Sequence, residues 1–264
     1  MTEICPIPAT IPDIQSQIDT RRIAIDAVGI KGLRHPIVIH DHAQAPQASV
    51  ATLSFTVSLP HDRKGTHMSR FVALLGDAPR DISMPKLLDL HHEMLLLLEA
   101  ESGQISLSFP YFVRKTAPQS GVASLMDYMA HFSVQGDVHE RDLIMGVEVP
   151  VTSLCPCSKE ISQYGAHNQR SHIRVEVQAE ANLSLTELIR MLEAQASCEL
   201  YGLLKRADEK HITEQAYENP KFVEDMIRDV AYVLGEDERI HGFSVEVENF
   251  ESIHNHSAYA RLSR

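Results

Sequence analysis

The sequence has few of the features that mark exported or membrane-bound proteins. Its 264 residues contain no tryptophan and only four cysteines, two of which flank a single proline, so no disulfide framework is expected. No run of about 18 or more apolar residues is present, and the N-terminus lacks the basic-then-apolar pattern of a signal peptide. These absences predict a cytoplasmic protein that makes no contact with a membrane.

Basic charge is also scarce. The chain has 24 lysines and arginines against 36 acidic residues, a net charge of -12 at pH 7. Because a phosphate backbone demands a broad basic surface, this balance disfavours nucleic acid as a partner. A phosphorylated small molecule is still compatible, provided that a local basic cluster shapes its pocket. No glycine-rich dinucleotide fingerprint occurs at any strand-to-helix turn, so neither a nicotinamide nor a flavin cofactor is expected.

The hydrophobic pattern predicts an α+β fold. Period-two alternation, clearest in Ala51–Leu59, predicts half-buried strands, and helical spacing predicts three helices. The strands are expected at 23–39 (with a break at 29–32), 51–59, 105–109, 126–134, 143–151, 173–179, 243–247 and just before Leu262. The helices are expected after Ser83 as far as Gly103, after Ser184, and from Asn219-Pro220 to Gly235. Strands, helix and strands thus follow one another twice, with sequential antiparallel pairing.

The richest chemistry lies between two of the predicted strands. Cys155 and Cys157 flank a proline at the end of an apolar strand, and His167 follows a polar loop. Thiolate and imidazole are preferred ligands of Zn²⁺, and two thiols with one usable histidine favour an open, catalytic metal site over a zinc finger. The alternatives are that the cysteines are small core residues or a redox pair. The polar character of the loop favours the metal or catalytic role.

A second candidate lies in the turn between Pro60 and Phe71. Lys64, His67 and Arg70 crowd this turn together with a glycine. The turn is either a solvated loop or an anion site, in which the arginine offers a planar fork and the lysine a point charge to phosphate oxygens.

Three stretches of the chain resemble one enzyme family. Ser-Leu-Cys-Pro-Cys-Ser-Lys followed by Tyr-Gly-Ala-His-Asn-Gln-Arg-Ser, Lys-Gly-Thr-His-Met-Ser-Arg-Phe, and Asn-Pro-Lys-Phe-Val-Glu-Asp are similar to elements of GTP cyclohydrolase type IB, the prokaryotic first enzyme of folate biosynthesis. The resemblance implies two tandem tunnelling-fold units, at 21–152 and 153–264 after a proline-containing arm at 1–20. It also implies a homotetramer in which oligomerisation closes the sheets into a barrel, with pockets between subunits. Unpaired sheet edges give such assembly an independent reason.

The resemblance also implies the roles of individual residues. Cys155, His167 and Glu209 occupy the positions of the metal ligands, and the metal is Zn²⁺, Mn²⁺ or Fe²⁺. Cys157 is either a fourth ligand or a proton donor. Without the resemblance, Glu209 would be a solvated surface glutamate.

The remaining expected residues would contact the substrate. Glu224 would hold the guanine edge through its two side-by-side acceptor oxygens, whereas the alternative is a helical ion pair with Arg228. His254 is the expected catalytic or phosphate-contacting histidine, and His256 lies on the same rim. The resemblance gives the 64–71 stretch, with Lys64, His67 and Arg70, a pocket-lining role near the nucleotide.

The implied reaction converts GTP and water to 7,8-dihydroneopterin triphosphate and formate. The metal activates a water for attack on C8 of the guanine, and histidine or thiol groups supply general acid–base catalysis. Two other functions are compatible with parts of the pattern. One is the related nitrile reductase of queuosine synthesis, which needs a covalent cysteine and a nicotinamide cofactor, and the other is a non-enzymatic purine- or metal-binding module.

Overall fold

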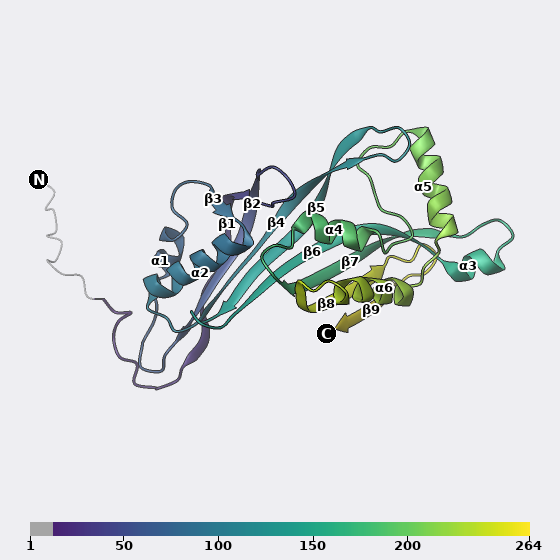
Figure 1. The fold of residues 1–264 in the computed structure, drawn as a ribbon. Helices are drawn as coiled ribbons and strands as arrows, with labels where there is room; N and C mark the ends of the chain where they lie inside the picture. Colours follow the sequence, from purple (N-terminus) through teal and green to yellow (C-terminus); the bar gives the residue numbers. More distant parts are fainter. Residues whose placement is uncertain (1–12) are drawn as a thin grey trace, which may run out of the picture.

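One nine-stranded sheet organises the chain (Figure 1). The computed structural model describes residues 13–264, so most of the predicted arm at 1–20 lies outside the described residues. The strand order is β3-β1-β2-β4-β5-β6-β7-β8-β9, and every neighbouring pair is antiparallel except β1 and β3. The elements are β1 (Ile25–Ile39), β2 (Gln47–Leu59), α1 (Met68–Ala73), β3 (Arg80–Ile82), α2 (Met84–Leu98), β4 (Gly103–Thr116), β5 (Ala123–Gly136), β6 (Arg141–Leu154), α3 (Pro156–Ile161), β7 (Asn168–Ala179), α4 (Leu185–Glu193), α5 (Arg206–Glu218), α6 (Val223–Gly235), β8 (Ile240–Asn249) and β9 (Ala258–Ser263).

The alternating sequence pattern produces the sheet, as expected. In β2 the apolar positions from Ala51 to Val57 are at most 2% exposed, while the residues between them are exposed or half-buried. These apolar rows face α2, α4 and α6, which cover one face of the sheet (Figure 1). The predicted break at 29–32 is wrong. β1 continues through it, and the pairing with β2 only shifts register between Ile30 and Leu33, next to Gly32 with its φ of 74°.

The three predicted helices are present, and two of them begin where predicted. The third was predicted to start at Asn219-Pro220, which is wrong: Asn219 is the C-cap of α5, and α6 begins only at Val223. Ser83 accepts a hydrogen bond from the Lys86 backbone, and Ser184 forms a complete capping box with Glu187. The first of these helices ends earlier than predicted, because Glu99 adopts a left-handed conformation after Leu98 and Gly103 already begins β4. The sequence pattern did not reveal α1, α3 and α5; two of these have only 6 residues, and α5 is highly polar.

The order of elements repeats along the chain. Two strands, a helical connection and two strands occur twice, and the change from one set to the next falls at the turn between β5 and β6. The strands of both sets form one continuous sheet. The predicted boundary between residues 152 and 153 falls inside β6, so the division into two units stays a prediction.

The sheet divides at one end, which we call the fork. β5 and β6 pair only as far as Met129 and Glu148, whereas β4 continues with β5, and β6 continues with β7. The β4–β5 hairpin therefore diverges toward α5, while the β6–β7 pair runs on toward α3 (Figure 1). Residues 196–202, which we call the wedge segment, enter the fork: Cys198 bridges to Thr152 of β6.

No helix within the described part of the chain combines the length and the apolar character needed to cross a membrane.

Candidate active site

Cys155 and His167 lie opposite each other where β6 and β7 end. The Cys155 N–H donates to the His167 carbonyl over 3.2 Å, which extends the pairing of the two strands by one step. The Ser158 hydroxyl donates to the Cys155 carbonyl over 3.1 Å and accepts from the His167 N–H over 3.2 Å. The expected polar loop contains a short helix, α3, with Cys155 at its N-cap position. The structure therefore brings two of the expected ligands together, while Cys157 lies exposed in α3.

The segment after β8 closes one side of this end. The Ser252 hydroxyl lies 3.0 Å from His167 Nδ1, which leaves Nε2 as the nitrogen available to a ligand. The Phe250 N–H donates to the Arg170 carbonyl over 2.9 Å and holds the same segment against β7. His254 and His256, which follow in it, are exposed, and their rings stack with centroids 5.2 Å apart. The tertiary structure thus places both histidines on the segment that contacts His167.

The start of α6 also reaches this end of the sheet. The Lys221 N–H donates to the Leu154 carbonyl over 3.1 Å, directly before Cys155. Glu224 follows in the first turn of α6 and is exposed. The alternative of a Glu224–Arg228 ion pair is not realised, because no such pair occurs among residues 13–264. The exposed carboxylate is free to meet a ligand.

Glu209 lies exposed on α5 and is fixed through its neighbour Asp208. Asp208 is fully buried and accepts hydrogen bonds from the backbones of Gln119 and Ser120, both over 2.8 Å, and from the Ser120 hydroxyl over 2.6 Å. Burial opposes its ionisation, but the hydrogen bonds outweigh burial and hold the Asp208 pKa well below its ordinary value. This contact ties the start of α5 to the tip of the β4–β5 hairpin.

Glu209 does not complete a metal site within one chain. Among residues 13–264, no group of three or more histidine, cysteine, aspartate and glutamate side chains is placed to hold a metal ion. The three-ligand set of Cys155, His167 and Glu209 therefore stays a prediction; within one chain, Cys155 and His167 are opposite each other through a backbone hydrogen bond.

The 60–71 turn lies at the opposite end of the molecule, next to α1 (Figure 1). The three residues predicted to contact phosphate have local partners: Lys64 Nζ contacts Gln17 over 3.4 Å, His67 contacts Asp13 over 3.3 Å, and Arg70 donates to the Leu97 carbonyl over 2.9 Å. A cavity of about 190 Å³ opens beside the turn. Within one chain, the structure does not bring these residues to Cys155.

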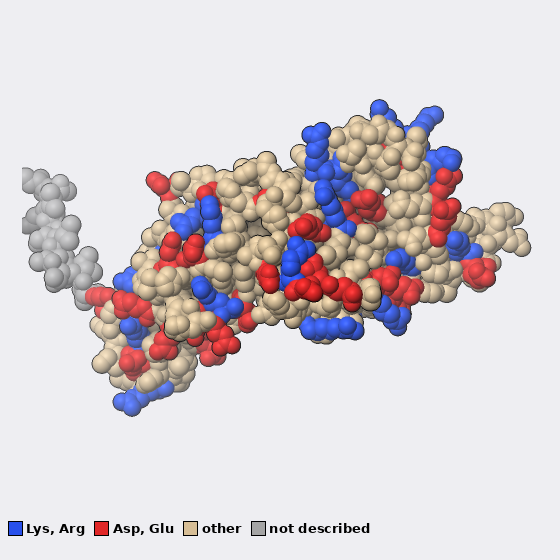
Figure 2. Space-filling view, in the orientation of Figure 1, with Lys and Arg blue, Asp and Glu red and all other residues tan. Residues whose placement is uncertain are grey.

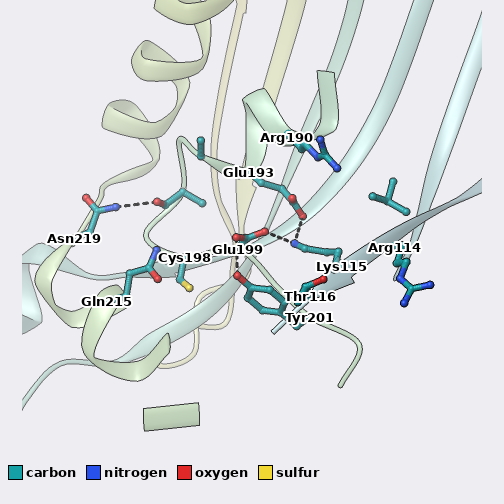
Figure 3. Close-up of a pocket in the computed structure, with 13 residues that line it drawn as sticks. Arg114, Lys115, Thr116, Arg190, Glu193, Cys198, Glu199, Tyr201, Gln215 and Asn219 are labelled. Atoms are coloured by element: carbon teal, nitrogen blue, oxygen red, sulfur yellow. Dashed lines mark hydrogen bonds and ion pairs between the residues drawn. The ribbon is translucent and has the colours of Figure 1, made fainter. Parts of the chain in front are cut away.

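A buried charged cluster at the fork was not anticipated (Figure 3). Lys115 Nζ lies 2.7 Å from Glu193 and 2.5 Å from Glu199, and it stands 4.6 Å from the centre of the Tyr201 ring. Lys115 and Glu193 are about as buried as the apolar core, at 6% and 5% side-chain exposure. The Tyr128 hydroxyl also donates to Glu193, over 2.6 Å. Lys115, Glu193, Glu199 and Tyr201 line a cavity of about 430 Å³.

The pKa values in this cluster reflect its burial. Burial raises the pKa of Glu193 above its ordinary value, although Lys115 and Tyr128 act in the opposite direction. Burial also raises the pKa of the nearby Cys198 thiol to about 11, so this thiol is protonated at neutral pH. The sequence did contain a signal: Lys115 continues the inward-facing alternation of β4 that runs from Ile105 to Val113. A lysine at an inward position requires a buried partner.

The charge on the visible surface is consistent with the prediction that nucleic acid is not a partner. On the face drawn in Figure 2, acidic and basic side chains of the described residues are interspersed, and no broad basic area is visible.

The fold is shared with uricases. The uricase from Arthrobacter globiformis aligns with 90% of this chain and 92% of its own length, with a TM-score of 0.52 and 10% sequence identity. A hyper-thermostable AgUricase mutant aligns over 91% of both chains, with a TM-score of 0.54 and 8% identity. At such low identity the likeness defines the class by fold alone: an α+β protein with the mostly antiparallel sheet of the tunnelling-fold uricases.

Sequence comparison then identifies the family. The profile described as "Type I GTP cyclohydrolase folE2" matches residues 11–260. The GTP cyclohydrolase FolE2 of an Azoarcus species is 53% identical over 262 residues, which cover 98% of this chain and 97% of the relative. The FolE2 of Burkholderia ambifaria is 54% identical over 254 residues, covering 96% and 94%. The chain belongs to the type I GTP cyclohydrolase FolE2 family, as the sequence motifs predicted.

Proposed function

We propose that this chain is a GTP cyclohydrolase that converts GTP and water to 7,8-dihydroneopterin triphosphate and formate, the first step of tetrahydrofolate biosynthesis. Family membership over nearly the whole chain supports the activity. The observation that carries the assignment to a site is the meeting of Cys155 and His167 where β6 and β7 end. The nitrile reductase and the non-enzymatic module are not favoured, because neither is the activity of this family.

The Cys155–His167 pair suits a divalent metal. A thiolate and an imidazole are a donor set for Zn²⁺, Mn²⁺ or Fe²⁺, and the Ser252 contact to Nδ1 orients the imidazole as partners of metal-bound histidines commonly do. Glu209 is the proposed third ligand, brought in by assembly of subunits. When bound, the metal supplies Lewis-acid activation of water for attack on C8 of the guanine.

The remaining steps of the proposed mechanism use the chain's own groups. Glu224 accepts the N1–H and the exocyclic amine of guanine and so fixes the position of C8. His254, on the segment that contacts His167, donates and removes protons during ring opening, loss of formate and reclosure. Cys157 is exposed beside Cys155 and is the second candidate proton donor. His256, Lys64, His67 and Arg70 are the proposed contacts to the triphosphate.

Assembly of subunits would complete the site. Ile161 and Tyr164, in and just after α3, and Ile253, in the segment after β8, are 83%, 97% and 65% exposed, and burial of this apolar surface would favour association. The proposed phosphate turn lies at the far end of the same chain, so a second subunit must supply it. These observations support a homotetramer in which neighbouring sheets close into a barrel around shared sites.

Metal analysis and a turnover assay test this function together. Protein purified under reducing conditions is stripped of metal, reloaded separately with Zn²⁺, Mn²⁺ or Fe²⁺, and incubated with GTP. We expect formate and a product that becomes a fluorescent pterin after oxidation, in equal amounts, only in metal-loaded samples. Absence of pterin with all three metals, or turnover that needs a nicotinamide cofactor, would overturn the proposal.

A further inference from the structure

The charged cluster at the fork contacts the segment that supports Cys155. Glu199 belongs to the wedge segment, and Lys115 joins it to Glu193 at the end of α4. The Tyr201 hydroxyl donates to Glu199 over 2.7 Å, and its ring lies under the Lys115 ammonium. One ammonium therefore holds β4, α4 and the wedge segment together.

The wedge segment in turn holds the end of β6. The Ser197 hydroxyl accepts the Leu154 N–H over 3.1 Å, and the Cys198 carbonyl accepts the Thr152 N–H over 3.0 Å. These bonds replace the pairing that β5 supplies to β6 before the fork, and they end one residue before Cys155. Without the segment, this edge of β6 would lose the partners of both N–H groups.

The wedge segment also packs tightly against β5. A Cβ atom at Gly202 would come within 2.7 Å of the Leu125 carbonyl oxygen, so the segment is pressed against β5 as well as against β6. Asn219 adds a bond from its side-chain amide to the Ala196 carbonyl, over 2.9 Å. The position of the segment therefore determines the separation of the two strands at the fork.

Buried charges of this kind require their partner. Loss of the Lys115 ammonium would leave the buried carboxylate of Glu193 and that of Glu199 without a counter-charge in a poorly solvated site. The carboxylates would then take up protons or turn toward solvent. Because Glu199 is in the wedge segment, its departure would pull on the bonds to Thr152 and Leu154.

We propose that Lys115 is a positioning residue of the active site. Its ion pairs with Glu193 and Glu199 hold the wedge segment in the fork and thereby fix the position of the end of β6, next to Cys155. The residue is not expected to touch the substrate. The proposal rests on the proposed role of Cys155 as a metal ligand, but its structural part does not depend on turnover.

Lys115→Met tests the proposal, because methionine fills similar space without the charge. In this variant we expect the backbone amides of Thr152 and Leu154 to exchange hydrogen at least about tenfold faster, as their bonds to the wedge segment open. We expect the dissociation constant for Zn²⁺, measured by chelator competition on metal-free protein, to rise about tenfold. The value of kcat should fall at least tenfold, with KM for GTP within about threefold of wild type.

Tyr111→Phe is the matched control. Tyr111 lies on the same strand and is also fully buried. Its hydroxyl contacts Asp41 and lies 2.8 Å from Thr186 of α4, and neither partner belongs to the wedge segment. We expect this variant to lower the melting temperature without changing exchange at Thr152 and Leu154 or the affinity for Zn²⁺.

If Lys115→Met does not fold, Glu199→Gln replaces it, since that change keeps the side-chain shape and weakens only one ion pair. Wild-type exchange rates and Zn²⁺ affinity in the folded variant would overturn the positioning role. If wild-type protein lacks GTP turnover, the proposed function fails, and the exchange rates still decide whether Lys115 holds the fork.

Discussion

The two ends of the sheet differ in how their polar groups are satisfied. At the Cys155 end the core itself becomes polar: Ser153 and Ser171 share a buried hydrogen bond of 2.7 Å, and Gln169 and Asn249 are also buried. The side-chain oxygens of Gln169 and Asn249 have no hydrogen-bond partner within residues 13–264. At the opposite end buried polar side chains are fewer: Thr66 lies in the Pro60–Phe71 turn, and the buried His91 of α2 contacts the Gly103 carbonyl over 3.0 Å.

This difference indicates that the two ends of the sheet have different roles. Buried polar side chains that replace apolar ones weaken a core, so their concentration at one end indicates a function there. In the 60–71 turn, His67 and Arg70 have local partners and line a cavity of about 190 Å³. The comparison predicts that the Cys155 end carries the chemistry, and that the turn acts on the site of another subunit.

The largest effect is expected at Cys155. Cys155→Ala should remove a metal ligand, lower the metal content and reduce turnover at least about a thousandfold, because the metal supplies several kcal/mol of activation. Circular dichroism should show an intact fold. Cys157→Ala is the matched control: loss of turnover with full metal content would make Cys157 a proton donor. Full metal content and turnover in Cys155→Ala would remove this residue from the site.

A smaller effect is expected from Glu224→Gln. One acceptor of the carboxylate becomes a donor that faces a guanine donor, a mismatch worth about 1–3 kcal/mol. We expect kcat/KM for GTP to fall at least about tenfold, with unchanged metal content. The melting temperature should hardly change, because Glu224 is exposed and forms no ion pair with Arg228 in the described chain. Wild-type kinetics would return Glu224 to the solvated surface.

A milder effect is expected at the opposite end of the sheet. If Arg70 contacts the triphosphate as proposed, Arg70→Ala should raise KM for GTP about three- to tenfold and leave KM for guanosine unchanged, because guanosine has no phosphate to bind the lost charge. Lys64→Ala should act in the same direction. An equal change for both substrates would mean that the turn acts by packing.

Mixed oligomers test whether the two ends meet between subunits. Equal amounts of Cys155→Ala and Arg70→Ala subunits, dissociated and reassembled together, should regain low-KM turnover at about a quarter of the sites, since only a shared site can contain both wild-type groups. If Cys155 and Arg70 of the same chain formed one site, no mixed site would show the low KM.

The smallest effect is expected at Asp208, and it depends on pH. The folded carboxyl has a depressed pKa, so its stabilising effect is complete above the unfolded pKa of about 3.9 and is lost as pH falls toward the folded value. Asp208→Asn should therefore lower the melting temperature by about 5 °C at pH 7, with a difference that shrinks below about pH 4. A pH-independent difference would show that the charge of Asp208 is unimportant.

Local patterns were sufficient for most of the fold. Alternation predicted the strands because one face of the sheet is buried, and Ser83 and Ser184 marked helix starts because capping is a local contact. α5 was missed because its face toward the protein is held by Asp208 rather than by an apolar stripe. The pairing of Cys155 with His167 followed from two strands that are neighbours in sequence.

The sequence by itself determined the class of fold and the family, and it placed Cys155 and His167 at the ends of two successive strands, because motifs and periodicity are properties of neighbouring residues. Only the tertiary structure decided that Lys64, His67 and Arg70 lie far from Cys155 in the same chain, and that Lys115 meets Glu193 and Glu199 at the fork. Lys115 and Glu193 are 78 residues apart, and no local pattern specifies which distant carboxylate will neutralise a buried ammonium. The partners of Lys115 are determined by the divergence of β5 from β6, which opens the space that the wedge segment fills.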